Sequence, residues 1–168
     1  AAAWQQAGLY EHASVASFAR FALELMALQA PPELLLEATR AQADEVLHAR
    51  ACFSMASAFS NAQLGPGELN LSGVMNREVN AKEVLVQTIL EGCINETLAA
   101  AEAAWLSERA TLAPIHRVQK QIAEDESRHA ALGWKTVRWI LQLHPELAGS
   151  AQDAFAKGRR RLSAHSPD

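Results

Sequence analysis

Apolar positions along the chain repeat at the spacing of helix faces. From residue 4 to 29, the apolar stripe near the 3.6-residue period consists of Leu9, Phe18, Phe21, Ala22, Leu25 and Leu28. Pro31 and Pro32 end this segment, and Pro32 suits the first turn of a second helix, which we expect over about 32–60. Because the linker is only a few residues long, the two helices should form an antiparallel hairpin.

A stretch rich in Gly, Pro, Asn and Ser separates this hairpin from the rest of the chain. It covers about residues 60–74 and indicates a long crossover loop. We expect a third helix over about 75–109, a fourth over about 114–143 and a short C-terminal helix over about 146–162. The pattern predicts an all-α fold with one domain over residues 1–168. Its four-helix bundle spans about 4–143, and a short helix and basic tail follow over 146–168.

The pattern Asp-Glu-x-x-His-Ala occurs twice, in the second and the fourth expected helix. One copy begins at Asp44 and the other at Asp125, in the second half of the chain. With 6 His in 168 residues, a lone Glu-x-x-His arises easily by chance, whereas two copies with the same flanking residues do not. The repeat therefore marks a shared chemical role.

Helix geometry explains the spacing within each copy. Residues three apart share a helix face, so Glu45 and His48 can bind one metal ion, and Glu126 and His129 can do the same. Asp44 and Asp125 each lie four residues before the His of their own helix. We expect each Asp to accept the second imidazole N–H of that His and to fix its orientation. Small apolar neighbours predict that both pairs are buried, and buried carboxylates need a compensating cation.

A dinuclear carboxylate site in a helical bundle needs one further Glu from each of two other helices. Glu11 is the candidate in the first helix, well before Glu45. In the third helix Glu91 precedes Glu126 by nearly the same number of positions, whereas Glu96 lies closer to it. The two are about 140° apart around a helix, so both cannot easily face one site. Internal symmetry favours Glu91, although the small neighbours of Glu96 leave room for a cluster; the other Glu would lie beside the site or at the surface.

Composition narrows the function further. The net charge of −4 and a pI near 5.9 give no general basic field, so we expect no nucleic-acid partner. The basic run at residues 157–161 fits a solvated helix end, and Cys52 and Cys93 fit small buried residues. No apolar run reaches the ~18 residues of a membrane span and no signal-peptide pattern is present, so we expect a cytoplasmic location. Because the chain starts with Ala1, we expect a processed form or part of a longer protein.

Over residues 4–143 the chain resembles the ferritin-like diiron-carboxylate superfamily, which includes ferritin, rubrerythrin and the small diiron hydroxylases. The resemblance implies that two iron ions bind to Glu11, Glu45, His48, Glu91, Glu126 and His129. It also implies that Glu45 and Glu126 bridge the ions, with Glu11 and Glu91 as terminal ligands. Val46 stands where bacterioferritin has its haem-ligating Met, so no haem is expected, and the paired C-x-x-C motifs of rubrerythrin are absent.

The expected function is that of an oxidoreductase which activates O₂ or peroxide at two iron ions, with Mn as an alternative at one or both positions. The substrate would be a small organic molecule, Fe(II) or peroxide itself. A ferroxidase, iron-storage or iron-delivery protein is the second interpretation, and a non-catalytic helical interaction domain is the third. The apolar run near Leu98 indicates a partner surface, and we expect a homo-oligomer.

Overall fold

The computed structural model describes residues 1–72 and 78–165, and within them every regular element is a helix. The elements are α1 (Ala2–Ala27), α2 (Pro32–Ser60), α3 (Ala81–Gln87), the π-helical segment η1 (Thr88–Asn95), α4 (Glu96–Arg109), α5 (Ala113–Leu143), the 3₁₀ turn η2 (Pro145–Leu147) and α6 (Ala148–His165). The predicted all-α class is confirmed. None of the described helices is both long enough and sufficiently apolar to cross a membrane.

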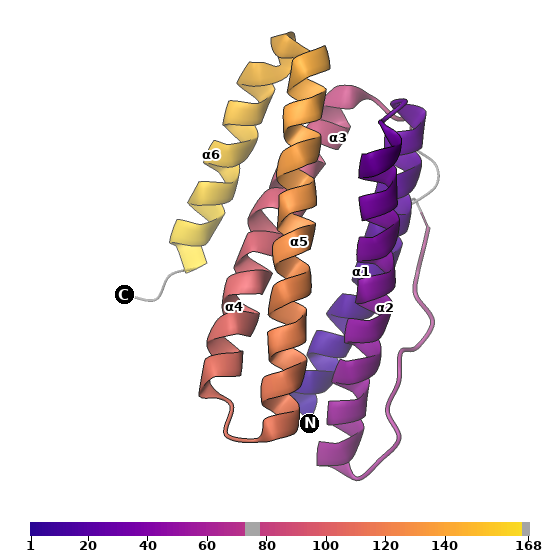
Figure 1. Ribbon diagram of the computed structural model, residues 1–168, viewed down its shortest axis with the longest axis vertical. Coiled ribbons are helices and arrows are strands. Elements are labelled where there is room, and N and C mark those ends of the chain that lie inside the picture. Colours follow the sequence, from indigo (N-terminus) through magenta and orange to yellow (C-terminus); the bar gives the residue numbers. More distant parts are fainter. Residues whose placement is uncertain (73–77, 166–168) are drawn as a thin grey trace.

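The long helices form two hairpins that lie side by side (Figure 1). In the first hairpin α1 packs against α2, and in the second the run from α3 to α4 packs against α5. The hairpins contact each other mainly through α2 and α5. Figure 1 shows that α2 and α4 run in the same direction, as a long connection between the hairpins requires, and that α6 folds back outside the second hairpin.

Local sequence determines where most of the helices begin and end. Pro32 occupies the first turn of α2, and Gln29 takes a left-handed φ of 58° in the turn before it, so α1 ends earlier than predicted. Asn80 caps α3 because its side-chain Oδ1 accepts a hydrogen bond of 2.9 Å from the Glu83 N–H. The third helix was predicted to start near residue 75. This is wrong for residues 78–80, which are not helical, and residues 75–77 lie outside the described part of the chain.

Three apolar clusters fill the interior and leave a polar layer between them. The cluster shared by α1, α2 and α5 consists of Phe18, Leu25, Leu34, Ala38, Ala41 and Leu132. The cluster shared by α3, η1, α5 and α6 includes Val84, Leu85, Ile89, Val137 and Ile140, and a third includes Cys52, Ala103, Ile122 and Ala123. Both cysteines are free and buried, as predicted. The Glu and His side chains of the repeated pattern lie in this otherwise apolar interior.

The two helices of the second hairpin touch backbone to backbone at a pair of glycines. A Cβ atom built on Gly133 of α5 would lie 2.6 Å from the backbone carbon of Gly92 in η1. A side chain at Gly133 would overlap the backbone of Gly92, whereas a Cβ at Gly92 would lie 3.3 Å from the Gly133 Cα, a tight contact. Gly133 therefore allows the close approach of the two helices. The π-helical segment, which the sequence did not predict, surrounds this contact.

Candidate metal centre

Six acidic and histidine side chains from four helices meet in the polar layer. They are Glu11 of α1, Glu45 and His48 of α2, Glu96 of α4, and Glu126 and His129 of α5. They form two groups, and within each group one ligand atom per residue lies within 4.8 Å of the others. The first group holds Glu11, Glu45, His48 and Glu126, and the second holds Glu45, Glu96, Glu126 and His129.

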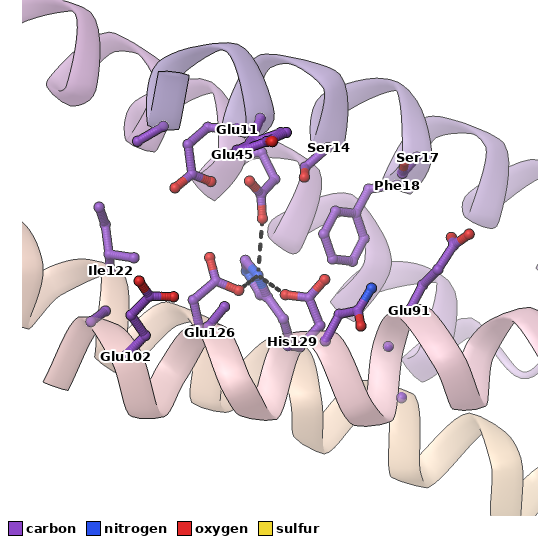
Figure 2. Close-up of a pocket in the computed structure, with 18 of the residues that line it drawn as sticks. Glu11, Ser14, Ser17, Phe18, Glu45, Glu91, Glu102, Ile122, Glu126 and His129 are labelled. Atoms are coloured by element: carbon purple, nitrogen blue, oxygen red, sulfur yellow. Dashed lines mark ion pairs between the residues drawn. The ribbon is translucent and has the colours of Figure 1, made fainter. Parts of the chain in front are cut away.

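The two groups are related by an approximate symmetry that exchanges the hairpins. In the first, His48 Nδ1 lies 3.7 Å from Glu11 Oε2 and 3.3 Å from Glu126 Oε1. In the second, His129 Nδ1 lies 3.8 Å from Glu96 Oε2 and 3.2 Å from Glu45 Oε1. Figure 2 shows Glu45, Glu126 and His129 turned toward one another. Because Glu45 and Glu126 belong to both groups, each could use its two carboxylate oxygens on two different ions.

Four atoms of this cluster are buried without a hydrogen-bond partner. They are Nδ1 of His48 and of His129, Oε2 of Glu45 and Oε2 of Glu126. Leaving a buried polar atom unsatisfied costs about 1–3 kcal/mol, and more when the group is charged. All four atoms belong to the shared Glu pair and the two His residues, so the cost is concentrated where a cation would remove it. The donor set of imidazole and carboxylate suits Fe, Mn or Zn.

The Asp residues of the repeat hold the imidazoles from behind, but each one serves the opposite helix. His48 Nε2 lies 2.9 Å from Asp125 Oδ2, and His129 Nε2 lies 3.3 Å from Asp44 Oδ2. The expectation that each Asp would bind the His of its own helix is therefore wrong. Each His points its Nδ1 into the cluster, so its Nε2 faces the neighbouring helix, where the other Asp lies. The two Asp–His contacts therefore link α2 to α5 twice.

Arg128 joins the two Asp residues at the surface of the same helix pair. Its Nη2 donates to Asp44 Oδ2 at 3.2 Å and also to Asp125 Oδ1. Gln121 Nε2 donates a further hydrogen bond of 2.8 Å to Asp125 Oδ1. One guanidinium thus connects the supports of both histidines. Arg128 was not predicted from the sequence, although its position three residues after Asp125 was a usable signal.

In the metal-free protein the cluster holds protons that a metal would displace. Burial alone would lower the pKa of His48, but the facing carboxylates of Glu11, Glu126 and Asp125 raise it to about 11. The pKa of His129 rises to about 12 because its carboxylate partners, Glu126 first, likewise outweigh burial. These raised pKa values show how strongly the cluster favours positive charge.

The carboxylates divide into two kinds. Burial, with the neighbouring carboxylates, raises the pKa of Glu45 to about 8 and that of Glu96 to about 8. Burial would raise the pKa of Glu126 as well, but the imidazoles of His129 and His48, whose Nδ1 atoms each lie 3.3 Å from one of its carboxylate oxygens, lower it well below its usual range. Glu126 therefore remains ionised between the two imidazoles while Glu45 and Glu96 retain protons, which is the arrangement expected when buried like charges crowd together.

Glu91, the carboxylate that internal symmetry favoured, lies outside the cluster, and Glu96 takes its place. The Glu91 side chain is 47% exposed, and its Oε2 accepts a hydrogen bond of 2.7 Å from Arg20 Nη2 of α1. Figure 2 shows it apart from the cluster, beyond Phe18. Gly92 faces α5 through its contact with Gly133, so the residue before it is turned aside, whereas Glu96 lies four residues after Gly92 on the same face.

The cluster forms the floor of a cavity of 820 Å³ between α1 and the run from η1 to α4. Phe18 lines this cavity, and its ring meets the His129 ring edge-on with centroids 5.0 Å apart.

Comparisons of the chain with protein-family models, curated proteins and solved structures gave no match. The chemistry of the site is therefore inferred from its own residues: two His–carboxylate groups, a shared pair of Glu and an accessible side.

Proposed function

We propose that this chain is a ferritin-like diiron-carboxylate oxidoreductase, which activates O₂ or peroxide at two iron ions held by Glu11, Glu45, His48, Glu96, Glu126 and His129. One observation carries the proposal. The Nδ1 atoms of both histidines are buried without a hydrogen-bond partner, and each faces the same shared pair, Glu45 and Glu126. The order hairpin, long connection, hairpin supports the ferritin-like assignment.

The charge balance supports a pair of divalent ions. Four carboxylates offset the charge of two such ions, and both histidines can be neutral once their Nδ1 protons are displaced. Iron in these positions supplies one-electron oxidation and reduction toward dioxygen species, and two ions together supply two electrons. Manganese fits the same donors, so an iron–manganese pair is the nearest alternative.

The protein's own groups orient and isolate the ions. Asp125 and Asp44 hold the two imidazoles through Nε2, and Arg128 holds both Asp side chains in turn. The apolar clusters on both sides exclude water, so the charges interact in surroundings of low dielectric constant. The cavity between α1 and α4 gives a second reactant access to the Glu11 and Glu96 side of the site.

Electron counting defines what else the reaction needs. Reduction of O₂ to water takes four electrons. Hydroxylation of an organic substrate supplies two of them from the C–H bond that becomes C–OH, and an external electron donor must supply the other two. A ferroxidase reaction takes all of them from Fe(II). Among the described residues, the cavity lining includes seven glutamates and a single arginine, and this acidic lining favours Fe(II) as the second candidate substrate.

Iron binding and the optical spectrum together test the proposal. Aerobically purified protein should contain about two irons per chain. Anaerobic loading with Fe(II), followed by air, should produce a near-ultraviolet band of an oxygen-bridged ferric pair, and Glu45→Ala should abolish it. Protein that binds no iron, or a band that persists in Glu45→Ala, would refute the diiron centre. Hundreds of irons per assembly would instead favour storage.

A further inference from the structure

The cavity over the candidate metal centre continues past it in both directions. Its lining on α1 runs from Ala3 to Glu24, and Glu11 lies between the two. The two ends belong to different apolar clusters. Phe18 lies in the cluster shared by α1, α2 and α5, whereas Ala103 lies in the cluster shared by α2, α4 and α5. Both residues line the cavity, and we call its two ends the Phe18 end and the Ala103 end.

Two contacts obstruct the Phe18 end. The Phe18 ring lies edge-on against the ring of His129, which belongs to the second group of ligands, with centroids 5.0 Å apart. Farther out, Arg20 Nη2 of α1 donates a hydrogen bond of 2.7 Å to Glu91 Oε2 of η1, so this ion pair joins the two sides of the cavity. Figure 2 shows Phe18 between Glu91 and the cluster. A molecule that enters here meets the ion pair first and the aromatic ring next.

The Ala103 end has no equivalent of the aromatic ring. The approximate symmetry between the hairpins exchanges Glu11 with Glu96. Phe18 follows Glu11 by seven residues, and Ala103 follows Glu96 by the same number, so the two positions correspond. A methyl group therefore stands at the Ala103 end where a ring stands at the other. The first group of ligands, which contains His48, is not covered in the way that Phe18 covers the second.

The ion pair has no equivalent at the Ala103 end either. By the same symmetry, Arg20 corresponds to Trp105 of α4, and Glu91 corresponds to Gln6 of α1. Neither Trp nor Gln carries a charge, so these two cannot form an ion pair. Trp105 instead stacks with Arg109 of its own helix, whose guanidinium carbon lies 4.2 Å from the ring centroid. The Ala103 end is therefore the less obstructed way into the cavity.

The lining of the Ala103 end suits small neutral molecules and cations. Ala7 and Ala99, both half-buried, line the cavity together with Ala103, and methyl groups take up little space. Glu102 also lines the cavity and is exposed, and Figure 2 shows it on the opposite side of the cluster from Phe18. Its carboxylate attracts cations and repels anions. A divalent ion or a small neutral molecule such as O₂ can therefore approach the centre from this end.

We infer that the two halves of the centre differ in access. Metal ions and small neutral reactants enter from the Ala103 end, so the ion of the first group, beside His48, exchanges with solvent and faces the second reactant. The ion of the second group, beside His129, is enclosed behind Phe18. The inference rests on the proposed function, because it states which ion of that centre meets the second reactant.

Release of metal from the unmodified chain tests the difference. Protein loaded with two redox-inert Zn(II) ions is mixed with an excess of a chromogenic chelator. One ion per chain should leave at least about tenfold faster than the other, because the slower ion waits for local opening of the fold around Phe18. Glu96→Gln, which keeps the ion beside His48, should match the fast phase, and Glu11→Gln, which keeps the other, should match the slow phase. A single phase, or the opposite assignment, would overturn the inference.

Matched variants locate the entrance. Ala99→Phe should slow the fast phase about tenfold by narrowing the Ala103 end, whereas Ala101→Phe, at an exposed position of the same helix, should leave it unchanged. Phe18→Leu should speed the slow phase alone, and Phe59→Leu, near the end of α2 and 49% exposed, should alter neither. If lining and control variants release Zn(II) at the same rates, the entrance lies elsewhere. The measurement on the unmodified chain remains decisive if a variant does not fold.

The two proposals fail in different ways. Release of Zn(II) needs neither iron nor O₂, and the iron test in the preceding section does not depend on the order of release. Two-phase release from a chain that gives no oxygen-bridged ferric band would refute the oxidoreductase and leave only the unequal access of the two ions. An intact ferric band with single-phase release of Zn(II) would refute the unequal access alone.

Discussion

Glu91 and Glu96 lie five positions apart on one helical run and have different surroundings. Glu96 Oε2 faces His129 Nδ1, whereas Glu91 Oε2 is held by Arg20. Glu96→Gln should therefore lower iron content from about two to about one per chain, because one group loses a charged ligand while the other keeps all of its own. Glu91→Gln, the matched control, should retain both ions. Elemental analysis of the two purified variants decides the point, and loss of iron in Glu91→Gln alone would mean that the ligand is Glu91.

The exchanged Asp–His pairs lead to a second prediction at the scale of single residues. Asp125 orients His48 across the helix boundary, and its pKa is lowered because its hydrogen bonds from His48, Arg128 and Gln121 outweigh the effect of burial. Asp125→Asn should weaken metal binding about 10–100-fold, in line with other residues that orient ligands.

Which of the two ions each Asp variant weakens tests whether each Asp supports the His of the other helix. In a Glu96→Gln background, which retains the ion near His48, Asp125→Asn should weaken the remaining ion strongly and Asp44→Asn should weaken it little. Competition with a chromogenic chelator measures both. The opposite order would mean that each Asp supports the His of its own helix.

Most of the cluster could be read from the sequence because its spacing is local. Glu45 and His48 are three residues apart on one helix, and such a pair shares a face whatever the rest of the chain does. The choice between Glu91 and Glu96 was not local. It depends on how η1 is rotated against α5, which is determined by the contact of Gly92 with Gly133 in the other helix of the hairpin. The small residues around Glu96 were the available signal.

At the scale of elements, helix boundaries could be predicted where neighbouring residues determine them, whereas the packing between helices could not. Pro32 and the short linker determined the start of α2 correctly, because the effects of proline are confined to neighbouring residues. The π-helical segment Thr88–Asn95 has no comparable local signature. The cavity arises from the way the hairpins pack through α2 and α5, with α1 and α4 lining it on either side. Single-helix patterns carry no such information.

Substitution of Gly133 tests the close helix contact. The Cβ of Gly133→Ala would lie 2.7 Å from the Gly92 carbonyl oxygen, and neither backbone can yield without moving a helix. The variant should lose about 1–3 kcal/mol of unfolding free energy, as overpacked interiors do. Gly149→Ala in α6 meets nothing within 4 Å and should be neutral or gain up to about 1 kcal/mol. Denaturant unfolding of both metal-free proteins gives the comparison, and equal stabilities would show that the helices separate easily.

At the scale of the whole molecule, a buried cluster that is arranged to bind metal destabilises the fold when no metal is bound. Burial first, and then Glu126 and Glu11, raise the pKa of Glu45 to about 8 from an ordinary value of 4.5. A raised folded-state pKa means that Glu45 contributes most stability below pH 4.5 and that the contribution is lost as pH rises toward 8. Glu96, also raised to about 8, acts in the same direction. The metal-free protein should therefore lose stability between about pH 5 and pH 8.

Bound metal should reverse this trend. Metal competes with protons for the cluster, so its affinity rises with pH, and binding to the folded state alone adds stability. Glu45→Gln separates the two effects because glutamine is nearly the same size and does not ionise. Without metal, the variant should be more stable than the wild type at pH 8, by about 2 kcal/mol or more, and similar to it at pH 5. With saturating Mn(II) at pH 8 the order should invert. Urea unfolding at the two pH values, with and without Mn(II), measures all four cases. If the stability of the metal-free wild type instead rises from pH 5 to pH 8, ionisation of the buried carboxylates does not destabilise the fold. The physical case for a metal centre would then fail.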